Sequence, residues 1–567
     1  MNDKNEKYIV DVGRFMLLFV GIDVLLTSVL LLFHVSISKL NFFLGLVISI
    51  LVYFLFFDNN LHRKRFTIVI SCGFLLFIII GNSLLYEIAY DGNLYHKFAV
   101  GILKMGYNPV YDKVEEYLTL LNIPLQSWHN DQIWVASYPK AAWYFDAGVY
   151  AITDWIESAK IFNAIIFISS FGICYNYFFY KLQKTFAYMI TFLLVATPTS
   201  VSMLLNFYLD GALGNLLITS IILLMSITDD AYTENKLRQF AYLGICIILC
   251  GNLKVTGLAY EGIFCFVFFI MWIVHLLKKS NRYIVIKKIG YVLLFYIGVV
   301  SIAVLVVGYG TYITNIINYG NILYPLGGLE GFDVSNNLKS VGLNHASPLI
   351  QILSMIFVKT NTNNKLSHLE WKIPFSFEMN EIDSSVYDVI RGGAGFLYSG
   401  IFCVAVIMFW IWNWKFRKNN DINKQMVYLI MLVSFGLMCV IPAGGQIRYS
   451  PYMFYFVSFT IYLWMLGIRA GCIKSRLSKK IPCIMFILLL LNVMPFTKFT
   501  MRVVEETIDY SSQFDDIAQK GGAYIDTELP GIVFNFIDRD IEYTYDTESE
   551  LNDGTMRYYH LNYNYMN

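Results

Sequence analysis

The sequence contains few charged residues and no excess of either sign. Only 15% of its 567 residues are charged, compared with about 25% in a typical soluble protein. Lys and Arg number 42 against 41 Asp and Glu, so the net charge of +1 gives no general attraction for nucleic acid. Hydrophobic residues make up 57% of the chain, and the mean hydropathy is +0.55. These values exclude a disordered chain and indicate a protein that exposes much of its surface to lipid.

Paired cysteines are absent as well. The nine cysteines include no CxxC pair and no cluster with histidine, and Cys246 and Cys250 share only helical spacing. Zinc sites and disulfide-stapled secreted domains both need closely grouped thiols. We therefore expect no metal site and no cofactor, and we interpret most of the cysteines as small packing residues within helices.

Long apolar runs are what the chain has in abundance. A membrane helix needs about 20 mostly apolar residues. Thirteen stretches approach that length: 15–35, 39–57, 66–85, 159–180, 186–204, 211–228, 239–253, 257–277, 289–309, 393–414, 425–443, 449–468 and 481–497. The sequence thus predicts an all-α polytopic membrane protein with about thirteen transmembrane helices.

The distribution of Lys and Arg predicts the orientation of these helices, because cytoplasmic loops carry an excess of both. Six connections are basic: 62–65, 181–184, 236–238, 278–288, 415–424 and 469–480. With thirteen spans they all fall on the side of the N-terminus, which is therefore expected to be cytoplasmic. The long segments 86–158 and 310–392 and the acidic tail from residue 498 fall outside. We expect a multi-pass protein of the plasma or inner membrane.

Three parts follow from this pattern: an N-terminal two-span segment (1–65), a transmembrane core with the two outer loops (66–497), and an acidic outer C-terminal segment (498–567). Apolar residues at helical spacing in the first outer loop predict short helices on the membrane surface. Alternation in Gly531–Phe536 predicts one or two strands in the C-terminal segment.

Acidic residues at the outer ends of spans are candidates for chemistry, since polar groups at a lipid boundary are costly unless used or paired. Asp91 follows the third span with His96 one helical turn later, and Asp210 precedes the sixth span. Asp91 is suited to be a general base, and two carboxylates on one face can divide acid–base work. The competing interpretation is that both are helix caps.

Cations and aromatics on the same side complete the candidate set. Lys254 and Arg448 break the charge asymmetry, and either can bind a lipid phosphate or simply anchor at the headgroups. Tyr324 lies in an aromatic turn before Pro325 and marks a candidate binding surface.

Several short motifs occur in a fixed order along residues 66–497. They are Tyr90-Asp91-Gly92, Asn108-Pro109, Tyr138-Pro139-Lys140, Glu157–Asn163, Tyr208-Leu209-Asp210, Lys254–Gly257, Asn321–Pro325 and Arg448-Tyr449. In this order they resemble the GT-C superfamily of membrane glycosyltransferases, which take a sugar from a polyprenyl-phosphate carrier outside the cytoplasm. The chain departs from the best-known members in having two spans before the one that leads to Asp91. It also has no Asp-x-Asp pair in the first outer loop.

The resemblance implies a role for each candidate. Asp91 would be the catalytic base, Lys254 and Arg448 would hold the carrier phosphate, and Asp210, His96 and Tyr324 would bind substrate. The donor would be a polyprenyl-phosphate-linked sugar, the acceptor an envelope glycan, lipid or protein, and the reaction inverting.

Two other functions remain open. An oligosaccharide-repeat polymerase uses the same carrier but is expected to have Arg-rich outer loops, whereas Arg391 is the only Arg in 310–392. A transporter or flippase for lipid-linked saccharides would need a polar pathway through the spans, for which Asp23 and Glu261 are candidates.

Overall fold

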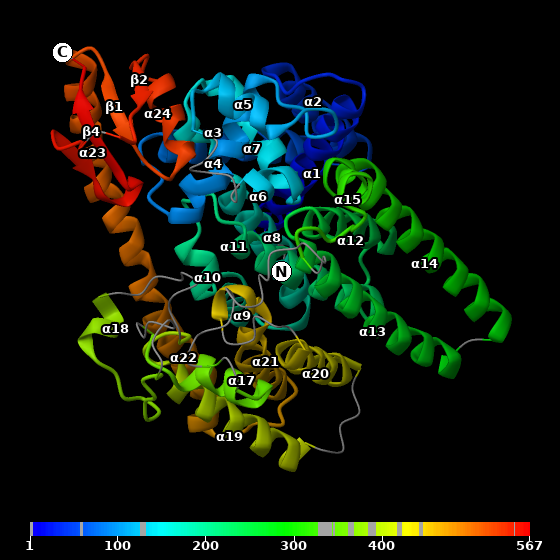
Figure 1. Ribbon diagram of the computed structural model, residues 1–567. Helices are drawn as coiled ribbons and strands as arrows, with labels where there is room; N and C mark the ends of the chain where they lie inside the picture. Colours follow the sequence, from blue (N-terminus) through cyan, green and yellow to red (C-terminus); the bar gives the residue numbers. More distant parts are fainter. Residues whose placement is uncertain are drawn as a thin grey trace.

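The computed structural model describes residues 4–56, 60–124, 132–279, 281–326, 343, 346–360, 368–383, 393–416, 422–440, 446–548 and 550–566. It is 75% helical with one small sheet (Figure 1). The described part contains nine helices long and apolar enough to cross a membrane: Lys7–Leu32, Lys39–Phe56, Leu61–Ser83, Ile156–Lys181, Asp210–Thr228, Val255–Lys279, Arg282–Val307, Pro451–Arg469 and Arg476–Gln519. The chain is therefore a mostly helical protein suited to a lipid bilayer.

In element terms these helices are α1 (Lys4–Leu32), α2 (Lys39–Phe56), α3 (Leu61–Ser83), η2 (Ile156–Ala159) with α8 (Phe162–Lys181), α11 (Asp210–Thr228), α13 (Val255–Lys279), α14 (Arg282–Ile302) with η3 (Ala303–Val307), η7 (Pro451–Phe454) with α21 (Tyr455–Arg469), and α22 (Arg476–Val493) continuing through η8 (Met494–Thr497) into α23 (Lys498–Gln519). The remaining four predicted spans are also helical but shorter or less apolar: α9 (Lys184–Val195), α12 (Lys236–Gly251), α19 (Tyr398–Phe416) and α20 (Ile422–Val440).

The fifth predicted span, 186–204, is broken. α9 ends at Val195, and a separate short helix, α10 (Pro198–Ser202), follows. Pro198 cannot donate a backbone hydrogen bond, and the Thr197 hydroxyl accepts one from the Ser200 amide at 3.2 Å, so a new helix begins here.

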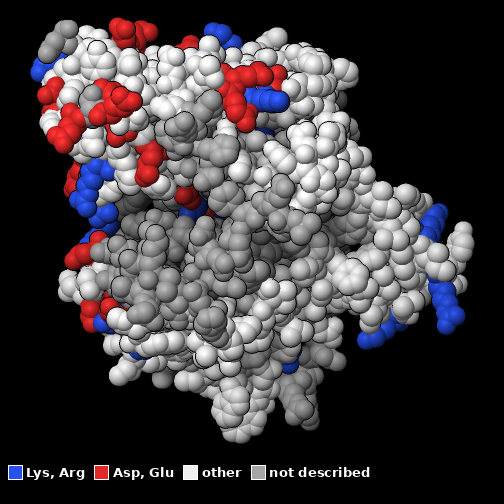
Figure 2. Space-filling view, in the orientation of Figure 1, with Lys and Arg blue, Asp and Glu red and all other residues white. Residues whose placement is uncertain are grey.

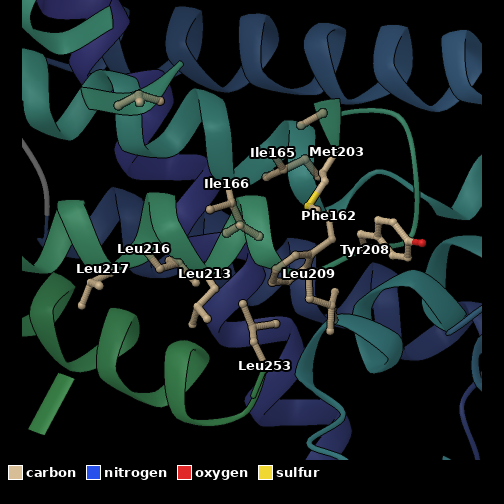
Figure 3. Close-up of a cluster of buried hydrophobic side chains, with 14 of the residues drawn as sticks. Phe162, Ile165, Ile166, Met203, Tyr208, Leu209, Leu213, Leu216, Leu217 and Leu253 are labelled. Carbon is tan, nitrogen blue, oxygen red and sulfur yellow. The ribbon is translucent and has the colours of Figure 1, made fainter. Parts of the chain in front are cut away.

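Close helix crossings organise the core. A Cβ at Gly13 of α1 would lie 2.9 Å from the Gly172 Cα of α8, so these glycines let the two backbones touch. α8 in turn packs on α11 through buried side chains: Phe162, Ile165, Ile166, Leu213, Leu216 and Leu217 (Figure 3). The same cluster includes Tyr208 and Leu209, the residues immediately before Asp210. A rigid apolar base therefore supports the outer candidate residues.

The first outer segment is folded into the protein. It contains η1 (Gly92–His96), α4 (Lys97–Met105), α5 (Val114–Leu120), α6 (Gln132–Ser137) and α7 (Ala141–Thr153). The predicted short helices are present, but α4 and α7 do not present one apolar face outward as surface helices would. Every residue from Ala141 to Ala151 is buried, because α7 packs against α1, α2 and α4.

The second outer segment is described only in part, and Arg391 lies outside the described residues. It contains η4 (Tyr309–Ile313), α15 (Thr314–Tyr319), α17 (Pro348–Phe357) and α18 (Met379–Asp383). Outside this segment, the 3-10 turn η6 (Ile447–Tyr449) comes just before η7 in the chain.

The C-terminal segment combines α23 with a four-stranded sheet of order β2-β1-β4-β3. Its elements are β1 (Ala523–Asp526), η9 (Pro530–Ile532), α24 (Val533–Ile537), β2 (Tyr543–Tyr545), β3 (Gly554–Met556), η10 (Arg557–Tyr559) and β4 (Leu561–Tyr565). Strands are present in this segment as expected, but their placement at Gly531–Phe536 is wrong, because this stretch is η9 and α24. Consecutive side chains there are all buried, which a one-sided strand does not allow.

Charge divides between two regions of the molecule. Figure 2 shows acidic side chains gathered over the C-terminal domain and basic ones at the tip of the α13–α14 hairpin. α13 ends with Lys278 and Lys279, and α14 begins with Arg282. The hairpin tip is thus basic, whereas the C-terminal domain in this view carries acidic side chains with Lys and Arg among them.

Candidate active site

Four of the predicted site residues converge on one ion network. Arg448 Nε donates to Asp210 Oδ2 at 2.9 Å, and Arg448 Nη2 donates to Asp91 Oδ2 at 2.7 Å. Lys254 Nζ forms an ion pair with Asp210 Oδ1. The side chains of Asp210 and Arg448 are each 2% exposed, whereas that of Asp91 is 19% exposed. Asp91 is thus the member of the network that a substrate can reach from water.

Each of these residues lies where a helix begins or ends. Asp91 comes just before η1, Asp210 is the first residue of α11, Lys254 separates α12 from α13, and Arg448 is in the short turn η6. The capping interpretation is wrong for both acids, because their carboxylates are directed at Arg448 and Lys254. Helix ends leave backbone irregular there, so side chains from distant segments can meet.

Aromatic rings enclose the cations. The Arg448 guanidinium lies 4.2 Å from the ring centroid of Tyr208, and Lys254 Nζ lies 5.1 Å from that of Tyr449. The Asp91 amide donates to the Tyr208 hydroxyl at 3.2 Å. Burial acts to lower the pKa of Arg448, but Tyr449 and the two carboxylates outweigh it and raise the pKa well above its usual value. Burial lowers the pKa of Lys254, and Asp210 partly offsets that shift.

His96 lies beside this network as a neutral side chain. Its Nδ1 accepts a hydrogen bond from Trp143 Nε1 at 2.9 Å, which places the ring proton on Nε2. Burial lowers the pKa of His96 well below its usual range, and Lys254 lowers it further. The buried Nε2 makes no hydrogen bond to a described residue. His96 therefore supplies an N–H donor, and its ring lies 6.3 Å from that of Tyr208.

Tyr324 and Lys254 line one pocket, together with Trp134 and Tyr138. The Tyr324 ring stacks on Tyr319 with 3.8 Å between centroids. The structure thus places the second outer segment, which carries Tyr324, next to the Lys254 ammonium group of the ion network.

Lys140 fixes the backbone beside this pocket. Its buried ammonium donates to the carbonyl oxygens of Ala136 and Tyr138, both at 2.8 Å, and to that of Gly310 at 3.1 Å. Burial lowers the pKa of Lys140 to about 7. This residue joins the first outer segment to η4, so it shapes the pocket from outside.

The residues of the motif Glu157–Asn163 have structural roles, and Asn163 contacts the turn before α11. Asn163 Nδ2 donates to the carbonyl oxygen of Asn206 at 3.1 Å, and its Oδ1 accepts from the Ala212 amide at 3.0 Å. These bonds fix the turn that carries Asp210. Glu157 forms ion pairs with Lys97 and Lys160 and accepts from the Glu87 amide, so it contacts the segment of Asp91 and not the Arg448 network itself.

Glu87 is the residue that sequence reasoning missed. Its carboxylate accepts from the Ala89 and Phe207 amides, both at 2.7 Å, and so ties the segment of Asp91 to that of Asp210. The side chain is buried, and a Cβ at Gly92 would lie 2.8 Å from its carboxyl carbon. The signal in the sequence was Gly92, which follows Asp91, since a glycine at this position leaves room for the Glu87 carboxylate.

Glu87 should make stability depend on pH. Burial raises its pKa from 4.5 to about 7, so ionisation of this carboxyl opposes folding. The free energy of unfolding should fall as pH rises from about 4.5 to 7, by up to about 3 kcal/mol. Glu87→Gln cannot ionise, so the melting temperature of the wild type should fall relative to this variant between about pH 5 and 8. The exposed Glu115→Gln should keep the wild-type slope, and a parallel slope in Glu87→Gln would contradict the assignment.

The described residues contain no group of three or more His, Cys, Asp or Glu side chains placed to hold a metal ion. No protein-family model, curated protein or solved structure matches the chain.

Proposed function

We propose that this protein is a membrane glycosyltransferase of the GT-C type. It transfers a sugar from a polyprenyl-phosphate carrier to an envelope glycan, lipid or protein on the outer side of the plasma or inner membrane. The observation that supports this is the convergence of Asp91, Asp210, Lys254 and Arg448 from four separate segments. In the proposed topology thirteen helices cross the bilayer, with the N-terminus in the cytoplasm and the network at the outer end.

The network divides the work of an inverting transfer. Asp91, the most exposed of the four, takes the proton of the acceptor hydroxyl as that oxygen attacks the anomeric carbon. The bond from this carbon to the phosphate oxygen breaks, and its electron pair leaves with the carrier phosphate. Lys254 and Arg448 stabilise that phosphate, and Asp210 holds both cations in place.

The charge balance of the network suits this sequence of events. Two carboxylates and two cations are neutral together before reaction. When Asp91 becomes protonated, the network gains one net positive charge. That charge appears as the phosphate becomes a leaving group, so the environment favours the transition state more than the bound donor.

Replacing Asp91 by Asn should lower sugar transfer by about 100-fold or more while the protein stays folded. Release of polyprenyl phosphate from a panel of polyprenyl-phosphate-linked sugars measures the reaction in purified protein. Asp230→Asn is the matched control, because Asp230 follows the other end of α11 and binds Lys279 at 2.7 Å. Full activity in Asp91→Asn would rule out this residue as the base. Movement of the carrier across vesicles without a new glycosidic bond would favour transport instead.

A further inference from the structure

The two ends of the ion network differ in exposure to water, since the Asp91 side chain is 19% exposed and that of Lys254 is 6% exposed. Contacts run in the order Asp91, Arg448, Asp210, Lys254, and the last of these lines the pocket with Tyr324. At the opposite end, Tyr90 precedes Asp91 in the chain and is 37% exposed. A donor phosphate held at Lys254 therefore leaves the Tyr90 side as the route by which an acceptor reaches Asp91.

The C-terminal domain contacts Tyr90 at this end of the network. The Tyr90 hydroxyl donates to Glu528 Oε1 at 3.0 Å, and the same oxygen lies 2.8 Å from His560 Nδ1. The rings of Tyr90 and His560 are 5.3 Å apart and inclined by 57°. About half of each of the Glu528 and His560 side chains is exposed, so the group faces solvent although its members touch. His560 ends η10 in the left-handed conformation, with a φ of 46°, and its ring lies beside Tyr90.

We propose that Tyr90, Glu528 and His560 bind the acceptor, and that the acceptor is an oligosaccharide. The group offers an aromatic face for the C–H side of a sugar ring, a carboxylate that accepts from hydroxyls, and an imidazole that can donate or accept. A lipid acceptor would need an apolar channel at this point, whereas these three side chains are polar and partly hydrated. The acceptor hydroxyl then passes its proton to the adjacent Asp91. This inference rests on the proposed function.

The test is binding of soluble oligosaccharides to the full-length protein in detergent, followed by saturation-transfer NMR. A panel of neutral and acidic envelope-type oligosaccharides serves as the probe. At least one member should bind, and His560→Ala and Glu528→Gln should each weaken its binding about tenfold. Thr555→Ala is the matched control, because Thr555 is exposed on β3 of the same domain and its hydroxyl donates to Asn562 Oδ1 at 3.0 Å. If no oligosaccharide binds, if the two variants bind as tightly as the wild type, or if a peptide proves to be the acceptor, the inference is overturned.

A second measurement separates this inference from the proposed function. Binding of decaprenyl phosphate should be unchanged in His560→Ala and Glu528→Gln, because the proposal assigns the carrier phosphate to Lys254 and Arg448 and the acceptor to these two residues. Loss of carrier binding in these variants would overturn the division into two sides. Failure of the wild type to bind decaprenyl phosphate, with oligosaccharide binding intact, would instead count against the glycosyltransferase alone.

Discussion

Replacing Asp210 by Asn should lower the free energy of unfolding by about 3–5 kcal/mol and abolish activity. Asp210 is the shared partner of Lys254 and Arg448, and its side chain is 2% exposed. Without its charge, Arg448 keeps Asp91 as a partner, but Lys254 becomes a buried cation with no carboxylate beside it. A buried ion without its partner costs far more than the intact pair contributes.

A double-mutant cycle distinguishes this effect from a general loss of packing. Lys254→Met removes the stranded cation, so Asp210→Asn with Lys254→Met should be more stable than Asp210→Asn alone. Thermal unfolding in one detergent, for the wild type and the three variants, gives the coupling energy. Asp230→Asn should change stability by less than about 1 kcal/mol, because its partner Lys279 is exposed. An Asp210→Asn protein as stable as that control would show that the network does not hold the fold.

The four network residues could be predicted because each is polar at the end of an apolar run. The free-energy cost of placing a polar side chain at a lipid boundary is enough to mark such residues as candidates. Their partners could not be predicted, since Asp91 and Arg448 are 357 positions apart and meet only when helices from both halves pack. For the same reason, the sequence leaves open whether Lys254 and Arg448 bind a phosphate or anchor at the headgroups, whereas the structure buries both inside the protein.

Errors in the sequence-based prediction arose where both faces of a segment are buried. In Gly531–Phe536 the alternation suggested a strand, but this stretch is buried against η1 and α4 and forms the short helical elements η9 and α24. The first outer segment was misread in the same way, because apolar spacing on α4 and α7 does not reveal whether lipid or protein covers them. Periodicity indicates how a segment is patterned, and only packing determines what it contacts.

Glu157 joins the C-terminal domain to the segment that carries Asp91. Its carboxylate binds Lys97 and Lys160, and all three side chains are no more than 1% exposed. It also accepts from Asn535 Nδ2 at 2.9 Å and from the Glu87 amide at 2.8 Å. A single carboxylate thus connects α24 of the C-terminal domain to the segment that carries Asp91.

Glu157→Gln keeps the shape of the side chain but leaves two buried ammonium groups without a carboxylate. The free energy of unfolding should fall by about 3–5 kcal/mol. Because Asn535 loses the charge it donates to, hydrogen exchange should rise in α24 and β1 before the membrane helices unfold. Asp515→Asn is the control, since it breaks an exposed pair with Arg539 in the same domain and should leave exchange unchanged. Slow exchange in α24 of the Glu157→Gln protein would show that apolar burial alone fixes the domain. Faster exchange there, with sugar transfer reduced although Asp91 is intact, would show that docking of the C-terminal domain sets the position of the base.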